Sequence, residues 1–320
     1  MMSVDALDLT YACGLPVERN VPLGPYTSLK IGGPADFFVR ARSAAELART
    51  LTAAHRLGLP WLLLGGGSNA LIADRGFRGL AIKVEAQPGQ RNRGQVLWET
   101  AEAVELRCEA GVLSAGLARW TAGLGWHGFE WAAGIPGTVG GAAAGNAGAY
   151  DGDMARCVQR VAAWFPDGER VIEVAALGYG YRTSRFKRGA QPGAILSVDL
   201  RLTRGETDAA LAKIESFERQ RREKQPTERS CGSVFKNPPP PLDSAGRLLD
   251  LAGLKGTAVG DAEISHKHAN FFVNRGRATA ADVLALIRQA RQRVEAVHGV
   301  RLEVEILLTG DWQDEETEDL

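Results

Sequence analysis

Long apolar runs are missing from this 320-residue sequence, and so is a surplus of charge of either sign. Apolar runs such as residues 61–64 are far shorter than the roughly 20 residues that cross a bilayer. The 38 basic residues balance the 38 acidic ones, so no overall field draws the chain to nucleic acid or to a membrane surface. Asp5 and Asp8 stand where a secretory signal would have a basic segment. We therefore expect a cytoplasmic protein that binds neither nucleic acid nor membrane.

Cysteine is scarce, and its spacing excludes the usual frameworks. Cys13, Cys108, Cys157 and Cys231 form no CxxC pair and no other metal-ligand spacing. Unpaired thiols are typical of a reducing compartment, so we expect neither a disulfide framework nor a metal site built from these residues.

The length and the 45% hydrophobic content predict two or three domains rather than one. We place boundaries near residues 88 and 222, where polar or charged stretches follow apolar ones. The resulting units are residues 1–88, 89–222 and 223–310, followed by an acidic tail over residues 311–320.

Several elements can be predicted from local patterns. A helix over 43–59 has Ser43 as its cap, and a second helix begins with a capping box of Thr279 and Asp282 and ends at Gly299. The apolar face of this second helix consists of Val283, Ile287, Ala290, Val294 and Val297. We also expect helices over 114–124 and 208–224, and strands over 61–64, 158–173, 194–202 and 300–308.

Glycine is abundant and clusters in two places. The first cluster is Gly65-Gly66-Gly67-Ser68-Asn69, directly after a predicted strand. Such a loop can point backbone N–H groups at a pyrophosphate without a side chain in the way. No helix follows, so it is not the GxGxxG fingerprint of the Rossmann fold, and a tight interdomain turn explains it equally well.

The second cluster runs from Ala133 to Tyr150 and contains almost no bulky side chain. It predicts a close approach of the backbone to something flat or charged, although small residues also let a helix lie tightly on a sheet. Two such loops in one chain favour a dinucleotide ligand.

These loops and four further motifs resemble those of the UDP-N-acetylenolpyruvoylglucosamine reductase family, and they occur in the family's order along most of the chain. The further motifs are YTSLKIGG (26–33), YRTSRF (181–186), CGSVFKNP (231–238) and LEVE (302–305). The short passage from Phe186 to the next strand resembles the second type of the family, which lacks a substrate-capping insertion.

The resemblance implies an α+β fold: a two-part FAD-binding module of the vanillyl-alcohol oxidase (PCMH) type, residues 1–88 and 89–222, plus a C-terminal α/β substrate-binding domain, residues 223–310. It also implies an enzyme that uses NADPH as co-substrate to reduce a small molecule, UDP-N-acetylglucosamine enolpyruvate, to UDP-N-acetylmuramate in peptidoglycan precursor synthesis. We expect a monomer, although no motif in the sequence reports on the oligomeric state. FAD should be bound non-covalently, because neither glycine loop offers a histidine or cysteine for attachment.

The family's functional residues can be carried over position by position. The catalytic residues would be Arg182, Ser233 and Glu305. Lys236 and Asn237 would contact the substrate. The FAD-binding residues would be Gly65, Gly66, Gly67, Ser68, Asn69, Gly134, Ile135, Pro136, Thr138, Gly140, Gly141, Asn146 and Gly148.

Other functions compete with this interpretation. An FAD oxidase or dehydrogenase of the same superfamily would share the glycine loops. A non-catalytic nucleotide-sugar sensor would keep the fold, but the presence of Arg182, Ser233 and Glu305 argues against it. His266 and His268 stand two residues apart without a third ligand at a suitable spacing, so we expect no metal.

Overall fold

The computed structural model describes residues 5–189 and 192–313 and consists of two compact units. Unit 1 comprises residues 1–19, 37–66 and 80–221, and unit 2 comprises residues 20–36, 67–79 and 222–320. The chain therefore passes several times from one unit to the other. Most of the expected acidic tail, residues 314–320, lies outside the described residues.

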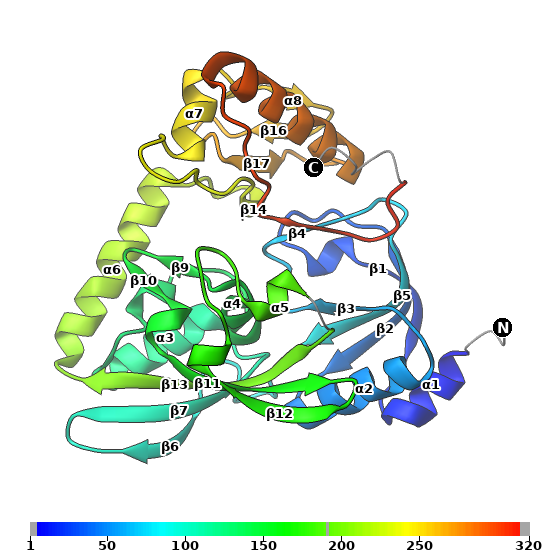
Figure 1. Ribbon diagram of the computed structural model, residues 1–320, viewed down its shortest axis with the longest axis vertical. Coiled ribbons are helices and arrows are strands. Elements are labelled where there is room, and N and C mark those ends of the chain that lie inside the picture. Colours follow the sequence, from blue (N-terminus) through cyan, green and yellow to red (C-terminus); the bar gives the residue numbers. More distant parts are fainter. Residues whose placement is uncertain (1–4, 190–191, 314–320) are drawn as a thin grey trace. The chain divides into compact units, whose positions relative to one another are not determined.

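The main sheet of unit 1 is antiparallel, with strands in the order β12-β11-β13-β7-β6, and the short β8 also pairs with β13 (Figure 1). Its strands are β6 (Gln95–Glu99), β7 (Ala103–Glu109), β8 (Trp126–His127), β11 (Val158–Phe165), β12 (Gly168–Glu173) and β13 (Ala194–Arg204). The strands expected over 158–173 and 194–202 are confirmed as β11, β12 and β13.

A second sheet has the order β1-β2-β5-β3, in which β3 and β5 run parallel. Its strands are β1 (Glu18–Pro22), β2 (Pro34–Ala41), β3 (Trp61–Leu64) and β5 (Phe77–Val84). Helix α2 (Ala44–Arg56) begins at Ser43, whose side chain accepts a hydrogen bond from the Glu46 N–H at 3.2 Å. Helix α1 (Ala6–Cys13) packs against α2, and both contribute to one apolar core. The predicted cap and the strand over 61–64 are thus confirmed.

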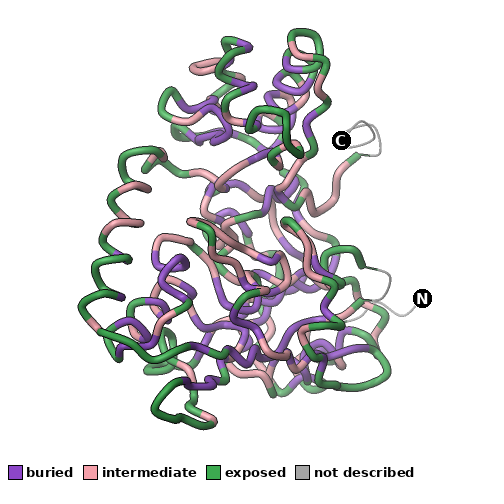
Figure 2. The backbone as a smooth tube through the Cα atoms, turned by 60° about the vertical axis from the view of Figure 1, so that its left-hand side comes forward, coloured by how far each residue is buried: buried purple, intermediate pink, exposed green. Residues whose placement is uncertain are grey.

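The remaining elements of unit 1 are mostly short helices. They are α3 (Ser114–Gly123), α4 (Val139–Gly145), α5 (Arg185–Arg188) and α6 (Thr207–Lys224), the 3-10 turns η2 (Glu130–Ala132), η3 (Met154–Arg156) and η4 (Val174–Ala176), and the hairpin of β9 (Gly148–Ala149) and β10 (Gly152–Asp153). Helix α6 buries only Ala210 and Ile214 along its length and is otherwise half-buried or exposed (Figure 2).

Unit 2 contains a sheet in the order β14-β17-β16-β15, and helices α7 and α8 pack with it around one apolar core (Figure 1). Its elements are η1 (Gly24–Tyr26), β14 (Arg229–Ser233), α7 (Ala245–Leu251), β15 (Ala258–Val259), β16 (Ala262–Ile264), β17 (Phe271–Asn274) and α8 (Ala280–His298). A separate parallel pair joins β4 (Ala70–Ile72) to β18 (Leu307–Thr309).

Helix α8 largely follows its sequence pattern. The capping box of Thr279 and Asp282 is present, and Gly299 ends the helix in the left-handed conformation with φ of 67°. The predicted apolar face is buried except for Val297, which lies in the last turn of the helix and is 44% exposed.

The strand predicted over 300–308 is wrong in extent. Only Leu307–Thr309 form a strand, and Val304 makes an isolated bridge to Phe235. Leu302 and Ile306 are buried, so the expected alternation is real. The segment has no continuous partner, however, and without one its apolar residues are buried in irregular backbone.

Candidate active site

The two glycine loops meet within unit 1. A Cβ atom at Gly65 would lie 2.5 Å from Thr138 Oγ1, and one at Gly66 would lie 2.6 Å from the Gly137 Cα. No side chain fits at either position without displacing backbone or the Thr138 side chain. The glycines are therefore required by the close approach of the loops to each other, in addition to any ligand.

The first loop also presents the backbone groups that a diphosphate would need. Among the described residues, the N–H groups of Gly66 and Gly67 donate no hydrogen bond to another part of the chain. The Lys83 ammonium donates to the Gly65 carbonyl, which fixes the start of the loop. Backbone donors without a nearby side chain suit an anionic dinucleotide such as FAD.

The second loop leads into α4, and its glycines pack closely on their surroundings. Thr138 caps the helix by accepting from the Gly141 N–H at 3.4 Å. A Cβ at Gly140 would lie 2.6 Å from the Ala110 Cβ. At Gly148 a Cβ would lie 2.6 Å from the Gly152 carbonyl oxygen. Gly140 and Gly148 therefore allow tight packing of the chain on its own neighbours. This packing role does not depend on a cofactor.

Arg182 occupies a strained position in a tight turn of unit 1. Gly180 and Thr183 exchange backbone hydrogen bonds of 3.1 and 3.2 Å, and Arg182 between them has φ of 54°. A left-handed backbone is uncommon for a residue with a long side chain and is concentrated at functional sites. The guanidinium carbon lies 5.6 Å from the centre of the Tyr181 ring.

Two side-chain hydrogen bonds hold this turn against the second glycine loop. The Asn146 amide donates to the Gly180 carbonyl at 3.0 Å, and the Ser184 hydroxyl donates to the Ala144 carbonyl at 2.6 Å. Asn146 also accepts from the Ala155 N–H at 3.0 Å, so both ends of its side chain are engaged. Asn146, predicted as an FAD ligand, therefore has a structural role: it joins the Arg182 turn to the predicted FAD loop.

Ser233 is placed by a bulge in unit 2. Strand β14 pairs with β17 at Ser230↔Val273 and Ser233↔Phe271, so three steps along β14 match two along β17. The extra residue is accommodated at Gly232, whose φ is 77°. Bulges of this kind re-aim a side chain at the end of a strand. Ser233 is half-buried at this strand end.

Asn270 clamps the chain just after Ser233. Its side-chain oxygen accepts from the Phe235 N–H at 2.9 Å, and its amide donates to the Phe235 carbonyl at 2.8 Å. Its own carbonyl accepts from the Val234 N–H at 2.9 Å. The sequence alone gives Asn270 no specific role, because its side-chain partner lies 35 residues away, beyond the reach of any local pattern.

Glu305 lies beside the same strand end. The Glu305 N–H donates to the Val234 carbonyl at 2.8 Å, next to the bridge between Val304 and Phe235. The Asn69 amide, from the end of the first glycine loop, donates to the Glu305 carbonyl at 3.4 Å. Unit 2 thus brings together Ser233, Glu305 and Asn69, three predicted site residues that are far apart in the sequence.

Ser28, in the YTSLKIGG motif, links the same segments. Its hydroxyl lies 2.6 Å from the Ser230 carbonyl oxygen and 3.3 Å from the Gly67 carbonyl oxygen, and its N–H donates to Gly67 at 3.0 Å. The motif was recognised in the sequence, but this linking role follows only from the structure.

The predicted substrate ligands already have partners within unit 2. The Lys236 ammonium pairs with the Glu303 carboxylate. The Asn237 side-chain oxygen accepts from the Ala245 N–H at 3.1 Å, at the start of α7. Both residues lie close to Ser233 in the chain, and each holds local structure in addition to any contact with substrate.

The described histidine, cysteine and acidic side chains can be compared with the needs of a metal site. They contain no group of three or more His, Cys, Asp or Glu side chains that could hold a metal ion. Cys13, Cys108, Cys157 and Cys231 are free and buried. Burial raises the pKa of the Cys157 and Cys231 thiols to about 12, so neither is ionised near neutral pH.

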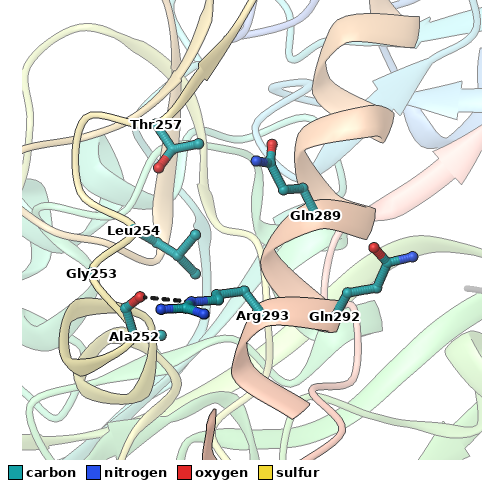
Figure 3. Close-up of a pocket in the computed structure, with 7 residues that line it drawn as sticks. All are labelled: Ala252, Gly253, Leu254, Thr257, Gln289, Gln292 and Arg293. Atoms are coloured by element: carbon teal, nitrogen blue, oxygen red, sulfur yellow. Dashed lines mark hydrogen bonds between the residues drawn. The ribbon is translucent and has the colours of Figure 1, made fainter. Parts of the chain in front are cut away.

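Unit 2 also has a pocket between the end of α7 and α8, formed by residues other than the predicted site residues. It is lined by Ala252, Gly253, Leu254, Thr257, Gln289, Gln292 and Arg293 (Figure 3). Arg293 Nε donates to the Ala252 carbonyl at 3.3 Å. None of the predicted site residues lines this pocket.

Across the described part of the chain, no helix is both long and apolar enough to cross a membrane.

Comparison with known proteins identifies the family. The C-terminal domain of UDP-N-acetylenolpyruvoylglucosamine reductase matches residues 225–309, and an FAD-binding domain matches residues 35–173. The reductase of Chloroflexus aggregans is 46% identical over 91% of this chain and 97% of its own length. The reductase of Moorella thermoacetica is 41% identical over 95% of this chain and 99% of its own length.

A solved structure agrees with these relatives. The crystal structure of the UDP-N-acetylenolpyruvylglucosamine reductase from Thermus caldophilus is 36% identical and covers 92% of this chain and 99% of its own, with a TM-score of 0.76. The expected α+β fold, an FAD-binding module of the PCMH type followed by a C-terminal domain, is confirmed. The chain belongs to the UDP-N-acetylenolpyruvoylglucosamine reductase family.

Proposed function

We propose that this protein reduces UDP-N-acetylglucosamine enolpyruvate to UDP-N-acetylmuramate, with FAD as cofactor and NADPH as the source of hydride, in peptidoglycan precursor synthesis. The observation that carries the proposal is family membership over nearly the whole chain, with 46% identity to the Chloroflexus aggregans reductase. Within that family frame, Arg182, Ser233 and Glu305 are all present, which a non-catalytic sensor would not require.

The glycine loops fit FAD. Gly66 and Gly67 offer backbone donors, and the close approach of Gly65 to Thr138 excludes side chains from the loop. FAD held by these loops would supply the hydride-transfer chemistry that links NADPH to the alkene of the substrate. We assign the predicted loop residues to holding its diphosphate and ring system without a covalent bond.

Arg182 would meet the negative charge that develops on the substrate carboxylate as hydride reaches the adjacent alkene. A guanidinium can hold a carboxylate through two parallel hydrogen bonds, which a lysine cannot do. The turn of Gly180–Thr183, tied to α4 by Asn146 and Ser184, would keep that fork in place.

Ser233 would donate the proton to the second alkene carbon, and Glu305 would orient or polarise the same region. A serine hydroxyl is a weak acid, so it works only when it is aimed at a strongly basic carbon. The Gly232 bulge and the Asn270 clamp on either side of Ser233 would hold the hydroxyl in a fixed direction. Lys236 and Asn237 would contact the substrate next to Ser233.

We also propose a monomeric, cytoplasmic enzyme. The 38 basic and 38 acidic residues balance, so we propose that it does not bind nucleic acid. We further propose the division of the FAD-binding module at residue 88 and a substrate-binding domain over residues 223–310.

Stopped-flow spectroscopy of the purified flavoprotein tests the function. NADPH alone should bleach the flavin absorbance, and addition of the enolpyruvyl nucleotide sugar should restore it. Ser233→Ala should leave the bleaching by NADPH intact. It should slow the second phase, reoxidation of the flavin by the enolpyruvyl sugar, by roughly 10²-fold or more, because only that phase requires a proton for the substrate.

Ser230→Ala is the matched control, because Ser230 lies on the same strand and accepts the Ser28 hydroxyl through its backbone carbonyl, which the substitution keeps. Its second phase should keep the wild-type rate. A reductase assignment is overturned if oxygen, and not the enolpyruvyl sugar, reoxidises the flavin after reduction by a hydroxy acid. That outcome supports the oxidase alternative.

A further inference from the structure

Arg221 lies in the last turn of α6 and packs on the second glycine loop. A Cβ at Gly134 would come 2.8 Å from the Arg221 Cδ, so the absence of a side chain at Gly134 makes room for the arginine. Gly134 lies at the start of the stretch of small residues whose composition favours a dinucleotide ligand. Arg221 is half-buried there, whereas Arg222, the next residue on the helix, is exposed.

Aromatic contacts fix this part of α6 within unit 1. The Tyr150 and Phe217 rings stack with centres 4.4 Å apart and planes 6° from parallel. The Tyr150 hydroxyl donates to the Phe217 carbonyl at 3.0 Å. Arg221 follows Phe217 by one helical turn and is therefore held close to the β9–β10 hairpin and the glycine loop.

No counter-charge accompanies the guanidinium. Within the ranges that the structure describes, no carboxylate forms an ion pair with Arg221 and no group accepts a hydrogen bond from it. Glu218, an acid on the preceding turn, pairs with Arg119. Burial lowers the pKa of Arg221, and among the described residues only Tyr150 opposes this shift.

A partly buried cation without a partner is unfavourable, and arginine cannot relieve the cost by losing its proton at physiological pH. Its five donors are suited to a planar or branched anion such as a phosphate. An external anion would therefore satisfy both the charge and the hydrogen-bonding capacity that the chain leaves unmatched.

We propose that Arg221 is a binding residue that holds a diphosphate of a nucleotide ligand beside Gly134. This inference rests on the proposed function, which brings two such groups to the protein: the diphosphate of FAD and the diphosphate of the UDP-sugar. Both present the same chemistry to a guanidinium, so the two sources are separated by experiment.

The test compares Arg221→Met, which keeps the length and apolar contact of the side chain, with Arg221→Lys, which keeps the charge but loses the fork. Arg204→Met is the matched control, because Arg204 is an exposed arginine at the end of β13 that pairs with Glu99. One arm measures the Kd of FAD for the apoprotein by quenching of flavin fluorescence. The other measures the Kd of UDP for the flavin-loaded protein by calorimetry.

Loss of a charge-assisted, two-pronged contact should weaken binding by about 10-fold to 100-fold in Arg221→Met, with a smaller loss in Arg221→Lys and no change in Arg204→Met. A loss confined to the FAD arm assigns the flavin diphosphate, and a loss confined to the UDP arm assigns the sugar nucleotide. Wild-type affinity in both arms overturns the proposal.

A fallback variant and a separate turnover assay cover the other outcomes. If Arg221→Met does not fold, Arg221→Lys alone decides, because unchanged affinities in a folded lysine variant contradict recognition by the guanidinium fork. Turnover of the enolpyruvyl sugar by the wild-type protein is measured separately. If the wild-type protein shows no turnover, the proposed function is wrong, and the Kd values of FAD and UDP still test the role of Arg221.

Discussion

Arg182 combines a proposed catalytic role with a backbone conformation that its side chain disfavours. Its φ of 54° is one that glycine adopts readily. We predict that Arg182→Gly and Arg182→Ala both lower turnover by roughly 10²-fold or more, because both remove the guanidinium. Arg182→Gly should nevertheless be the more stable by about 1 kcal/mol, since only alanine retains the left-handed strain.

Turnover assays and urea unfolding measure the two effects separately. Arg185→Ala, three residues further on and exposed, is the control and should keep its activity. Near-normal turnover in either Arg182 variant would show that this arginine takes no part in the reaction. Equal unfolding free energies of the two variants would show that the turn relaxes without strain.

At the scale of single elements, the β14 bulge at Gly232 lies directly before Ser233. A Cβ at Gly232 would meet nothing closer than the Ser68 carbonyl oxygen at 4.0 Å, so alanine fits sterically but must adopt a φ of 77°. We predict that Gly232→Ala lowers the free energy of unfolding by about 1 kcal/mol. It should also lower turnover, because relief of the strain would move the bulge and Ser233 with it.

Gly253 provides a matched control. It has a similar φ of 74°, a Cβ there would meet no atom within 4 Å, and it follows α7 rather than β14. Gly253→Ala should lose similar stability in urea unfolding but keep full turnover. If Gly232→Ala is destabilised equally and remains fully active, the bulge does not aim the serine.

At the scale of the whole molecule, one histidine links folding to pH. Burial lowers the pKa of His268, whose ring stacks edge-on against Phe271 and whose Nδ1 accepts from the Asn270 N–H at 3.2 Å. The folded state therefore favours neutral His268. Above the unfolded-state pKa of about 6.5, His268 is neutral in both states and does not change the free energy of unfolding. Below that pH, the unfolded chain binds the proton more readily than the folded one, which lowers the free energy of unfolding.

We predict that unfolding free energy falls as pH drops from about 6.5 toward the lowered pKa of His268. His268→Asn, whose side-chain oxygen can still accept from the Asn270 N–H, should show a flatter profile over that range. His266→Asn is the control, because that side chain is 71% exposed. Parallel profiles for wild type and His268→Asn would refute this linkage.

Much of the molecule could be predicted from the sequence because the signals are local. Ser43, the Thr279–Asp282 capping box and Gly299 act within one helical turn of the ends that they mark. The glycine clusters and the ordered motifs were enough to predict the family and its FAD-binding fold. The catalytic roles of Arg182, Ser233 and Glu305 remain predictions that rest on that family.

The tertiary structure decided what depends on partners far away in the chain. Asn270 as a clamp for Phe235, Asn146 as a tether for the Arg182 turn and the bulge at Gly232 all require neighbours that no local pattern identifies. The segment 300–308 shows the same limit, because its alternation was correct but its pairing was not. Alternation records which side chains avoid water, whereas a strand forms only where another backbone lies alongside to share its hydrogen bonds.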